Sequence, residues 1–169
     1  NADKFLMILA PFIIFTGAFL TFIGLPFAQN IVISDFNEKI TSKMEKNAEK
    51  VAKSLGAKVV KKIHVPGTFE IPFAVKNLLE DKKISTSVAL REKIDAVVTL
   101  GAVIQGDTQH DVVIVNTIAQ KLLELSLHYN KPIGFGIIGP RVTWQQADAR
   151  AIEYSKRAVK AALHMAKIK

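Results

Sequence analysis

The segment from Gly101 to His110 carries the residue types of a small ligand-binding loop. Its glycines at positions 101 and 106 allow the backbone to bend closely around a ligand. A helix predicted to begin near Asp111 would point its free N–H groups back at the loop, which favours a phosphate or a carboxylate. The charge of Asp107 opposes an anion unless that side chain faces away, so the segment is either an anion site or a tight turn.

His110, at the end of this loop, can accept or donate a proton near neutral pH. The alternative is that it caps the following helix or is simply solvated. No two histidines have the spacing of metal ligands and the chain has no cysteine, so we expect neither a zinc site nor a thiolate nucleophile. A G-x-S-x-G motif and a phosphate-binding lysine after a glycine-rich loop are both missing from the sequence. The chemistries that remain are proton transfer, anion binding and plain ligand binding.

Three aromatic residues, Phe36, Phe69 and Phe135, fall near the predicted ends of strands. Each side chain either stacks on a planar ligand or caps the core. Three of them converging on one edge of the fold would favour the ligand. Arg150 and the pair at 156–157 lie on the predicted last helix, where a solvated basic face is the usual role.

The chain is basic, with 23 Lys and Arg against 15 Asp and Glu in 169 residues and a net charge of +8. A basic chain invites a nucleic-acid hypothesis. Its lysines, however, are spread through several segments without interleaved exposed aromatic residues. We therefore expect no nucleic-acid partner.

Hydrophobic periodicity places these residues on alternating strands and helices. Strands are predicted over residues 30–34, 58–65, 96–100 and 132–138, and helices over 42–55, 71–79, 111–129 and 143–168. The spacing of a capping box at Ser42–Glu45 and again at Thr143–Gln146 marks two of the helix starts. The polar segment 80–93 is predicted to be a surface loop.

Four strands that alternate with four helices are typical of a parallel sheet covered on both faces. The predicted fold is therefore α/β, a three-layer sandwich with a four-stranded parallel sheet flanked by helices. Such sheets bind ligands outside the carboxyl ends of their strands. The unusual residues described above follow predicted strands, so the same edge of the sheet is the expected site.

The first 28 residues differ in composition from the rest of the chain. Residues 5–27 form a run of 23 residues without a charge, longer than the roughly 20 residues that a helix needs to cross a bilayer. We therefore divide the chain into an apolar segment over 1–28, a possible transmembrane span, and a globular domain over 29–169. An apolar arm packed against a neighbouring subunit and a non-native N-terminus are the alternatives.

Four segments of the globular domain together resemble one family. They are Phe36-Asn37 with Ile40-Thr41, the octapeptide Val65-Pro-Gly-Thr-Phe-Glu-Ile-Pro72, the segment from Leu100 to Asp111, and Lys131-Pro132 leading to Gly139-Pro140. Their order and sequence resemble 6,7-dimethyl-8-ribityllumazine synthase, with the shorter, archaeal-type members closest. The resemblance runs over about residues 30–168.

The resemblance implies a flavodoxin-like fold and the penultimate step of riboflavin biosynthesis. In that step 5-amino-6-(D-ribitylamino)uracil condenses with 3,4-dihydroxy-2-butanone 4-phosphate, with loss of phosphate and water. Members of the family need no metal or organic cofactor. They are cytoplasmic and form pentamers, often sixty-subunit icosahedral shells, with sites between subunits. The expected partners are therefore the two small substrates and further copies of the chain.

On the pyrimidine side, the resemblance assigns Phe36 to stacking on the ring and Phe135 to the aromatic contributed by the adjacent subunit. The ribityl chain and the ring edge are assigned to Thr68, Phe69 and Glu70. The uracil is assigned to backbone groups of Ala102, Val103 and Ile104.

On the phosphate side, the resemblance places Asp107 and Thr108 beside the butanone phosphate. It makes His110 the residue that transfers protons. Arg150 is our choice for the arginine that binds the phosphate, although the spacing around the last helix leaves Arg157 as an alternative.

The sequence departs from the family pattern in several places. Asp35 and Gln105 stand where many bacterial members have arginine, residues 84–91 look like an insertion, and the apolar lead over 1–28 is foreign to the family. Two other functions stay open on these grounds. One is a noncatalytic module that binds a flavin or a pyrimidine, and the other is an assembly protein tethered to a membrane through residues 5–27.

Overall fold

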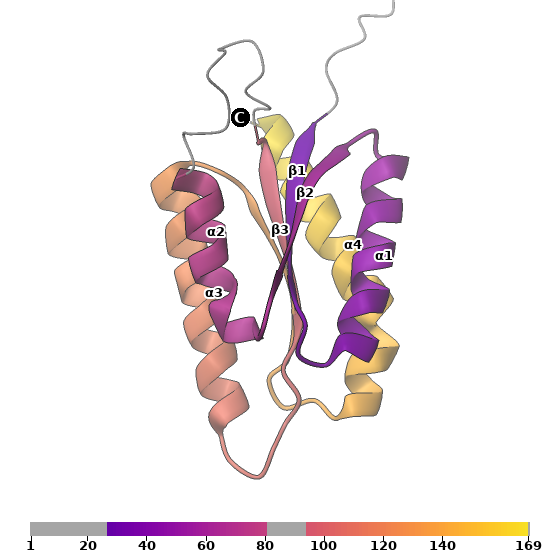
Figure 1. Ribbon diagram of the computed structural model, residues 1–169, viewed down its shortest axis with the longest axis vertical. Coiled ribbons are helices and arrows are strands. Elements are labelled where there is room, and N and C mark those ends of the chain that lie inside the picture. The colour runs from indigo at the N-terminus through magenta and orange to yellow at the C-terminus, as the bar shows by residue number, and fades with distance from the viewer. Residues whose placement is uncertain (1–26, 81–93, 169) are drawn as a thin grey trace, which may run out of the picture.

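The computed structural model describes residues 27–80 and 94–168, which form three layers. A sheet lies between two pairs of helices, with α2 and α3 on one face and α1 and α4 on the other (Figure 1). The strands are β1 (Ala28–Ser34), β2 (Lys58–Val65), β3 (Ala96–Ala102) and β4 (Ile133–Ile138). The helices are α1 (Glu38–Ser54), the 3₁₀ turn η1 (Thr68–Glu70), α2 (Ile71–Glu80), α3 (His110–Tyr129) and α4 (Trp144–Ile168).

The four strands are all parallel and lie in the order β2-β1-β3-β4. This order confirms the predicted α/β fold with a four-stranded, flavodoxin-like parallel sheet. Because every strand runs in the same direction, all four carboxyl ends meet at one edge of the sheet, at the bottom of Figure 1. The segments that follow the strands are thereby brought to that edge.

The central strands are buried on both faces, as continuous apolar runs predict. Ile31 and Ile33 of β1 pack into the core beneath α1 and α4. Val32 lies between them in sequence and packs into the core beneath α2 and α3. The outer strand β2 is largely exposed, which suits its three lysines. The apolar pattern therefore distinguishes the two central strands from β2.

Two helix starts were predicted from capping boxes, and the structure supports one of them. The Thr143 N–H donates to Gln146 Oε1 at 3.0 Å, and the Gln146 N–H donates to Thr143 Oγ1 at 3.2 Å, so this box is formed. The prediction at Ser42 is wrong, because α1 already begins at Glu38. Asn37 adopts the left-handed conformation with φ 61°, which turns the chain into the helix four residues earlier.

Two parts of the sequence-based description lie outside the described residues. They are the apolar segment before Phe27 and the predicted insertion at 84–91. The division at residue 28, the membrane hypothesis and the surface loop therefore stay predictions. Within residues 27–80 and 94–168, no helix combines the length and the apolar character that a membrane crossing needs.

Candidate active site at the carboxyl edge of the sheet

A cavity of about 470 Å³ opens at the carboxyl edge of the sheet, toward α2 and α3. It is formed by the segments that follow three strands and by the first turns of α3. Its lining comprises Phe36, Asn37, Gly67, Thr68, Phe69, Ala102, Val103, Ile104, Gly106, Thr108, His110, Asp111 and Ile114. Eight of the twelve residues that the sequence predicted for the site line this cavity.

The turn after β1 presents Phe36 at one side of the cavity, with 67% of its surface exposed. The Asp35 N–H donates to the Val65 carbonyl at 2.8 Å, which extends the pairing of β1 with β2 into the turn. On the other flank, Asn37 Nδ2 donates to the Ala102 carbonyl at 2.9 Å. Phe36 is therefore an exposed aromatic between two anchored neighbours, a suitable surface for a planar ligand.

The segment after β2 contributes a second aromatic and a close backbone approach. Thr68 is buried, whereas Phe69 is exposed at the cavity. A Cβ atom on Gly67 would lie 2.7 Å from Glu70 Oε2, so the Glu70 carboxylate is folded over this glycine. Glu70 itself does not line the cavity. A larger residue at position 67 would have to displace its carboxylate.

The segment after β3 is fastened to the turn that follows β4. The Val103 N–H donates to the Ile138 carbonyl at 2.8 Å, and the Gln105 N–H donates to the Val142 carbonyl at 2.9 Å. Since the Ala102 carbonyl accepts from Asn37, two of the backbone groups predicted to read a uracil already have partners within the chain. The Val103 N–H is thereby used within the chain, whereas the Ala102 carbonyl keeps a second lone pair for a ligand.

Helix α3 begins at His110, which lines the cavity together with Thr108. The His110 N–H donates to Thr108 Oγ1 at 3.3 Å. The next residue, Asp111, is 4% exposed, and its Oδ2 accepts from the Arg141 N–H at 2.8 Å. This bond fixes the start of α3 against the turn before α4. The positive end of α3 and a histidine thus face the same space, where an anion and a proton can both be handled.

Four predicted residues do not belong to the lining of this cavity: Glu70, Asp107, Phe135 and Arg150. The prediction that Phe135 falls at a strand end is wrong, because it lies within β4 opposite Thr99. Arg150 lies on α4, in the layer on the other face of the sheet. No lysine or arginine belongs to the described lining. A lysine or arginine contact to a phosphate bound here would therefore have to come from outside this lining.

Five residues of the lining were not assigned to the site from the sequence, namely Asn37, Gly67, Gly106, Asp111 and Ile114, although Gly106 was predicted to shape the ligand-binding loop. Four of them lie inside motifs that carried the resemblance, and Ile114 follows the third motif by one helical turn. Asn is also a residue type that tolerates the left-handed conformation. That signal favoured a tight turn at Asn37, but it did not reveal the bond from its side chain to Ala102.

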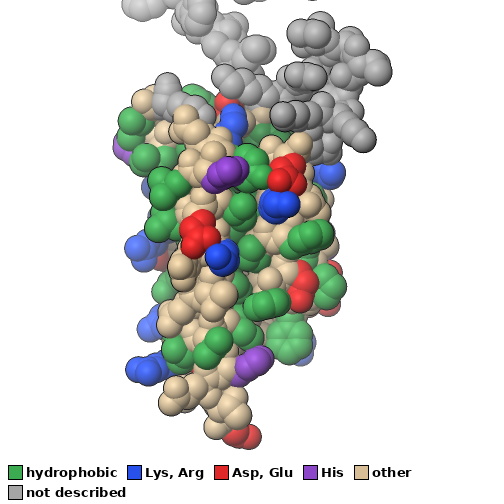
Figure 2. All heavy atoms as spheres, turned by 90° about the vertical axis from the view of Figure 1, so that its left-hand side faces the viewer, with side chains coloured by type: hydrophobic (Ala, Val, Ile, Leu, Met, Phe, Trp, Pro, Cys, Tyr) green, Lys and Arg blue, Asp and Glu red, His purple; other side chains and the backbone are tan. Residues whose placement is uncertain are grey.

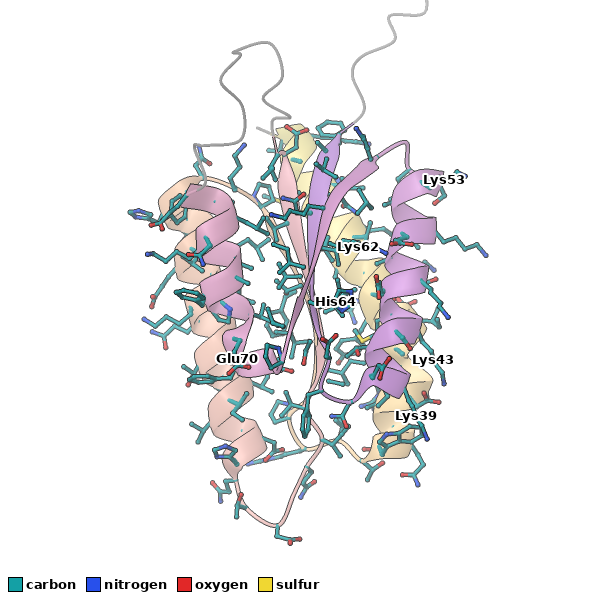
Figure 3. All side chains as sticks on the ribbon, viewed as in Figure 1. Lys39, Lys43, Lys53, Lys62, His64 and Glu70 are labelled. Atoms are coloured by element: carbon teal, nitrogen blue, oxygen red, sulfur yellow. The ribbon has the colours of Figure 1, made fainter. Side chains whose placement is uncertain are left out.

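A network of charged side chains runs from the turn after β1 across β2 to α1, and Figure 3 shows its two β2 members, Lys62 and His64. His64 Nδ1 lies 2.7 Å from Asp35 Oδ1, and His64 Nε2 lies 3.6 Å from Glu45 Oε1. Lys62 Nζ lies 2.9 Å from the same Glu45 oxygen and 2.5 Å from Glu49 Oε1. The hydrogen bond with Asp35 raises the pKa of His64 above its usual value, and the charge of Glu45 adds to this effect. The bonds with Glu49 and Glu45 likewise raise the pKa of Lys62.

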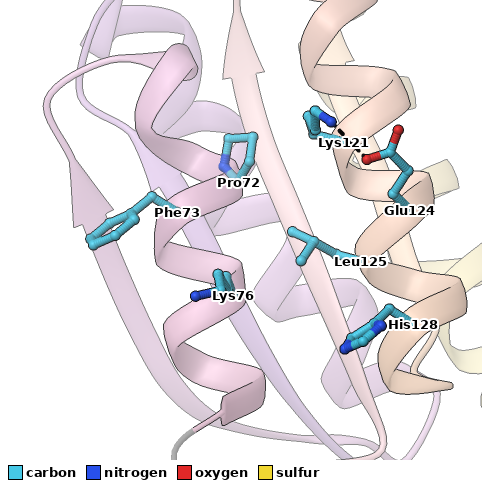
Figure 4. Close-up of a pocket in the computed structure, with 7 residues that line it drawn as sticks. All are labelled: Pro72, Phe73, Lys76, Lys121, Glu124, Leu125 and His128. Carbon is cyan, nitrogen blue, oxygen red and sulfur yellow. Dashed lines mark hydrogen bonds and ion pairs between the residues drawn. The ribbon is translucent and has the colours of Figure 1, made fainter.

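A second hollow, of about 390 Å³, lies on the outer surface between α2 and α3 (Figure 4). Its lining includes Phe73, Leu125 and His128. Lys121 and Glu124 form an ion pair at 2.8 Å across its rim. Its lining residues come from α2 and α3 and not from the segments that follow the strands, so this hollow is a surface groove between two helices.

The fold and the first cavity together define a class of protein. A parallel α/β sheet presents exposed aromatics, a helix start and a histidine at its carboxyl edge, the arrangement of an enzyme that binds a planar ligand beside an anionic one and moves protons between them.

Comparison with known proteins specifies this class further. A family model described as 6,7-dimethyl-8-ribityllumazine synthase matches residues 27–169. The chain is 48% identical over 136 residues to the lumazine synthase of Methanococcus vannielii, covering 80% of this chain and 89% of that protein. The same figures hold for the synthase of Methanocaldococcus jannaschii. The synthase of Metallosphaera sedula is 50% identical over 137 residues, covering 81% and 84% of the two chains. The chain belongs to the 6,7-dimethyl-8-ribityllumazine synthase family, transferases of riboflavin biosynthesis, which confirms the resemblance and the enzymatic function.

Proposed function

We propose that the cavity at the carboxyl edge of the sheet is where this chain condenses 5-amino-6-(D-ribitylamino)uracil with 3,4-dihydroxy-2-butanone 4-phosphate. The observation that carries the proposal is the meeting of Phe36, Phe69 and His110 around one space at the start of α3. A pyrimidine needs an aromatic surface and a butanone phosphate needs an anion site. Both substrates would be held in register there, which by itself supplies much of the acceleration of a two-substrate reaction.

The pyrimidine lies on Phe36 in this proposal, with its ribityl chain directed toward the segment from Gly67 to Glu70. Phe36 is exposed, which supports its role as a stacking surface. Glu70 reaches the ribityl chain only if its carboxylate turns away from Gly67, over which it is folded. The uracil edge is read by backbone groups between Ala102 and Ile104 that the chain does not itself use.

The phosphate lies at the start of α3, close to Thr108. Schiff-base formation, phosphate elimination and ring closure each move protons, and His110 is the titratable group of the cavity placed to accept and return them. Asp111 is buried and accepts a hydrogen bond from the backbone of Arg141, so its role is to hold the helix start rather than to transfer a proton.

A second subunit completes the site in this proposal by supplying Phe135 and Arg150. The absence of lysine and arginine from the described lining supports it, because a bound phosphate needs a positive partner. Helices α2 and α3 also leave large hydrophobic side chains exposed, among them Phe73, Val113 and Leu127. Figure 2 shows hydrophobic side chains spread over this face among charged ones. Such a surface favours association with further copies of the chain.

Formation of the fluorescent lumazine from the two purified substrates tests the proposal. We expect the wild-type chain to accelerate it, and a chain that binds the pyrimidine without accelerating it would instead be a noncatalytic binding module. His110→Ala should lower kcat about 100-fold without abolishing turnover, since proton transfer contributes part of the acceleration and positioning the rest. His128→Ala, on the same helix but outside the cavity, is the matched control. Equal rates for the two variants would contradict the role of His110.

A further inference from the structure

The ion pair between Asp35 and His64 has no part in the mechanism above, yet it adjoins the residue that carries the pyrimidine. Asp35 directly precedes Phe36, and its Oδ1 lies 2.7 Å from His64 Nδ1. His64 is the penultimate residue of β2, the outer strand of the sheet. The pair therefore bridges the turn after β1 to a neighbouring strand.

Phe36 depends on its neighbours for its position. With 67% of its surface exposed, it gains little from packing. On one flank Asn37 is fixed by its bond to the Ala102 carbonyl. On the other flank the Asp35 backbone is fixed by Val65, and the Asp35 side chain is fixed by His64. The backbone that carries the aromatic ring is thus held by bonds on both sides of it.

The surroundings of His64 suit an imidazolium ion. In addition to Asp35 from the β1 end, Glu45 of α1 faces its Nε2 at 3.6 Å. Lys62, also on β2, shares that Glu45 oxygen and reaches Glu49 of α1. A protonated imidazole can donate from both nitrogens toward the two carboxylates, whereas the neutral ring can donate from only one.

We propose that His64 is a positioning residue for the condensation, which through Asp35 holds Phe36 in the orientation that stacks on the pyrimidine, and that its loss of a proton weakens pyrimidine binding. The inference rests on the proposed function of the cavity. It concerns one substrate only, because His64 lies at the Phe36 flank and not at the start of α3.

The direction of the pH dependence follows from the raised pKa of His64. The paired, charged form is fully present below the pKa of about 6.5 that histidine has in an unfolded chain. It is lost as the pH rises through the higher pKa of the folded protein. The KM for the ribitylaminouracil should therefore rise as the pH increases above about 6.5, while the KM for the butanone phosphate stays constant.

The test uses His64→Gln and Asp35→Asn in the full chain, with Glu49→Gln as the control that removes an ion pair of the same network without touching His64. At pH 6 each of the first two variants should raise the KM for the ribitylaminouracil about threefold, in keeping with the modest strength of exposed ion pairs. The wild-type KM should approach theirs at alkaline pH, and His64→Gln should no longer show the rise. The control should behave as the wild type does.

Equilibrium binding of the lumazine product, followed by its fluorescence, gives a second readout that does not require turnover. Both variants should bind the product about threefold more weakly than the wild type does. If the wild type turns over and both variants bind and react as it does at every pH, the positioning role of His64 is wrong and the proposed function stands. If the wild type neither turns over nor binds the product, the proposed function fails first.

Discussion

The two pairs of helices that cover the sheet differ in how tightly they pack and in how much hydrophobic surface they leave exposed within a single chain. Helices α1 and α4 pack through small buried residues, among them Ala48, Ala52, Ala151 and Ala158. Their outer edges are joined by polar contacts, such as the two bonds that Asn47 Nδ2 donates to Ser155 Oγ and the Ile152 carbonyl. This layer is therefore held together within one chain, although Ile152, Met165 and Ile168 of α4 remain exposed.

The layer of α2 and α3 is open by comparison. It leaves Phe73, Leu123 and Leu127 exposed, and it borders the cavity at the carboxyl edge of the sheet. The difference teaches that the layer of α1 and α4 contributes mainly to stability, whereas the layer of α2 and α3 borders the ligand cavity. Substitutions of the same kind should therefore have different consequences on the two faces.

The largest expected effect concerns the closed layer. A Cβ atom on Gly134 would lie 2.2 Å from the Ala158 carbonyl oxygen of α4. Gly134→Ala must push α4 off the sheet, so we expect it to lower the free energy of unfolding by about 3 kcal/mol. Chemical denaturation measures this. Gly106→Ala is the matched control, because nothing lies within 4 Å of its added Cβ atom, and equal stabilities would refute the close packing of α4.

A smaller effect is expected at the open layer, on binding rather than folding. Phe36→Ala removes the proposed stacking surface and should weaken pyrimidine binding by up to about tenfold, since aromatic stacking contributes about 0.5–1.5 kcal/mol. Its stability should stay near that of the wild type, because Phe36 is mostly exposed. Fluorescence titration with the lumazine product measures the affinity. Leu55→Ala, at the end of α1, is the control, and comparable losses in both variants would argue against stacking at Phe36.

The smallest effect is expected on association. Leu127 is 73% exposed on α3, and Ile152 is 51% exposed on α4. Leu127→Gln should leave the fold within about 0.5 kcal/mol of the wild type. It should nevertheless weaken self-association, which analytical ultracentrifugation measures, and Ile152→Gln should disturb it less. If Leu127→Gln self-associates as strongly as the wild type does, this face does not join subunits.

Most of the fold could be predicted because it follows from local patterns. Continuous apolar runs identified β1 and β3. The capping-box spacing at Thr143–Gln146, whose hydrogen bonds are formed in the structure, identified the start of α4. The start of α1 was misplaced because the signal at Ser42 is local, whereas the true start depends on Asn37 and its contact with Ala102, 65 residues away. Sequence spacing does not report such a long-range bond.

The candidate site could be predicted where motifs coincided with strand ends. Phe36, Phe69 and His110 were found in this way and share the cavity. The pairing of Asp35 with His64 could not be predicted, because it depends on the register of β1 against β2. The partner for a bound phosphate stays a prediction for a related reason, since the proposed function assigns it to a second subunit.

One paired substitution tests most directly whether lumazine is formed in the cavity of the open layer. Ile114→Trp places a bulky ring in the cavity, whereas Ile152→Trp places the same ring on the surface of α4. With both variants shown to be folded by circular dichroism, initial rates of lumazine formation are measured for each and for the wild type. We expect the wild type and Ile152→Trp to react at similar rates and Ile114→Trp to lose most of its activity. Equal rates for Ile114→Trp and the wild type would contradict the assignment of the reaction to this cavity.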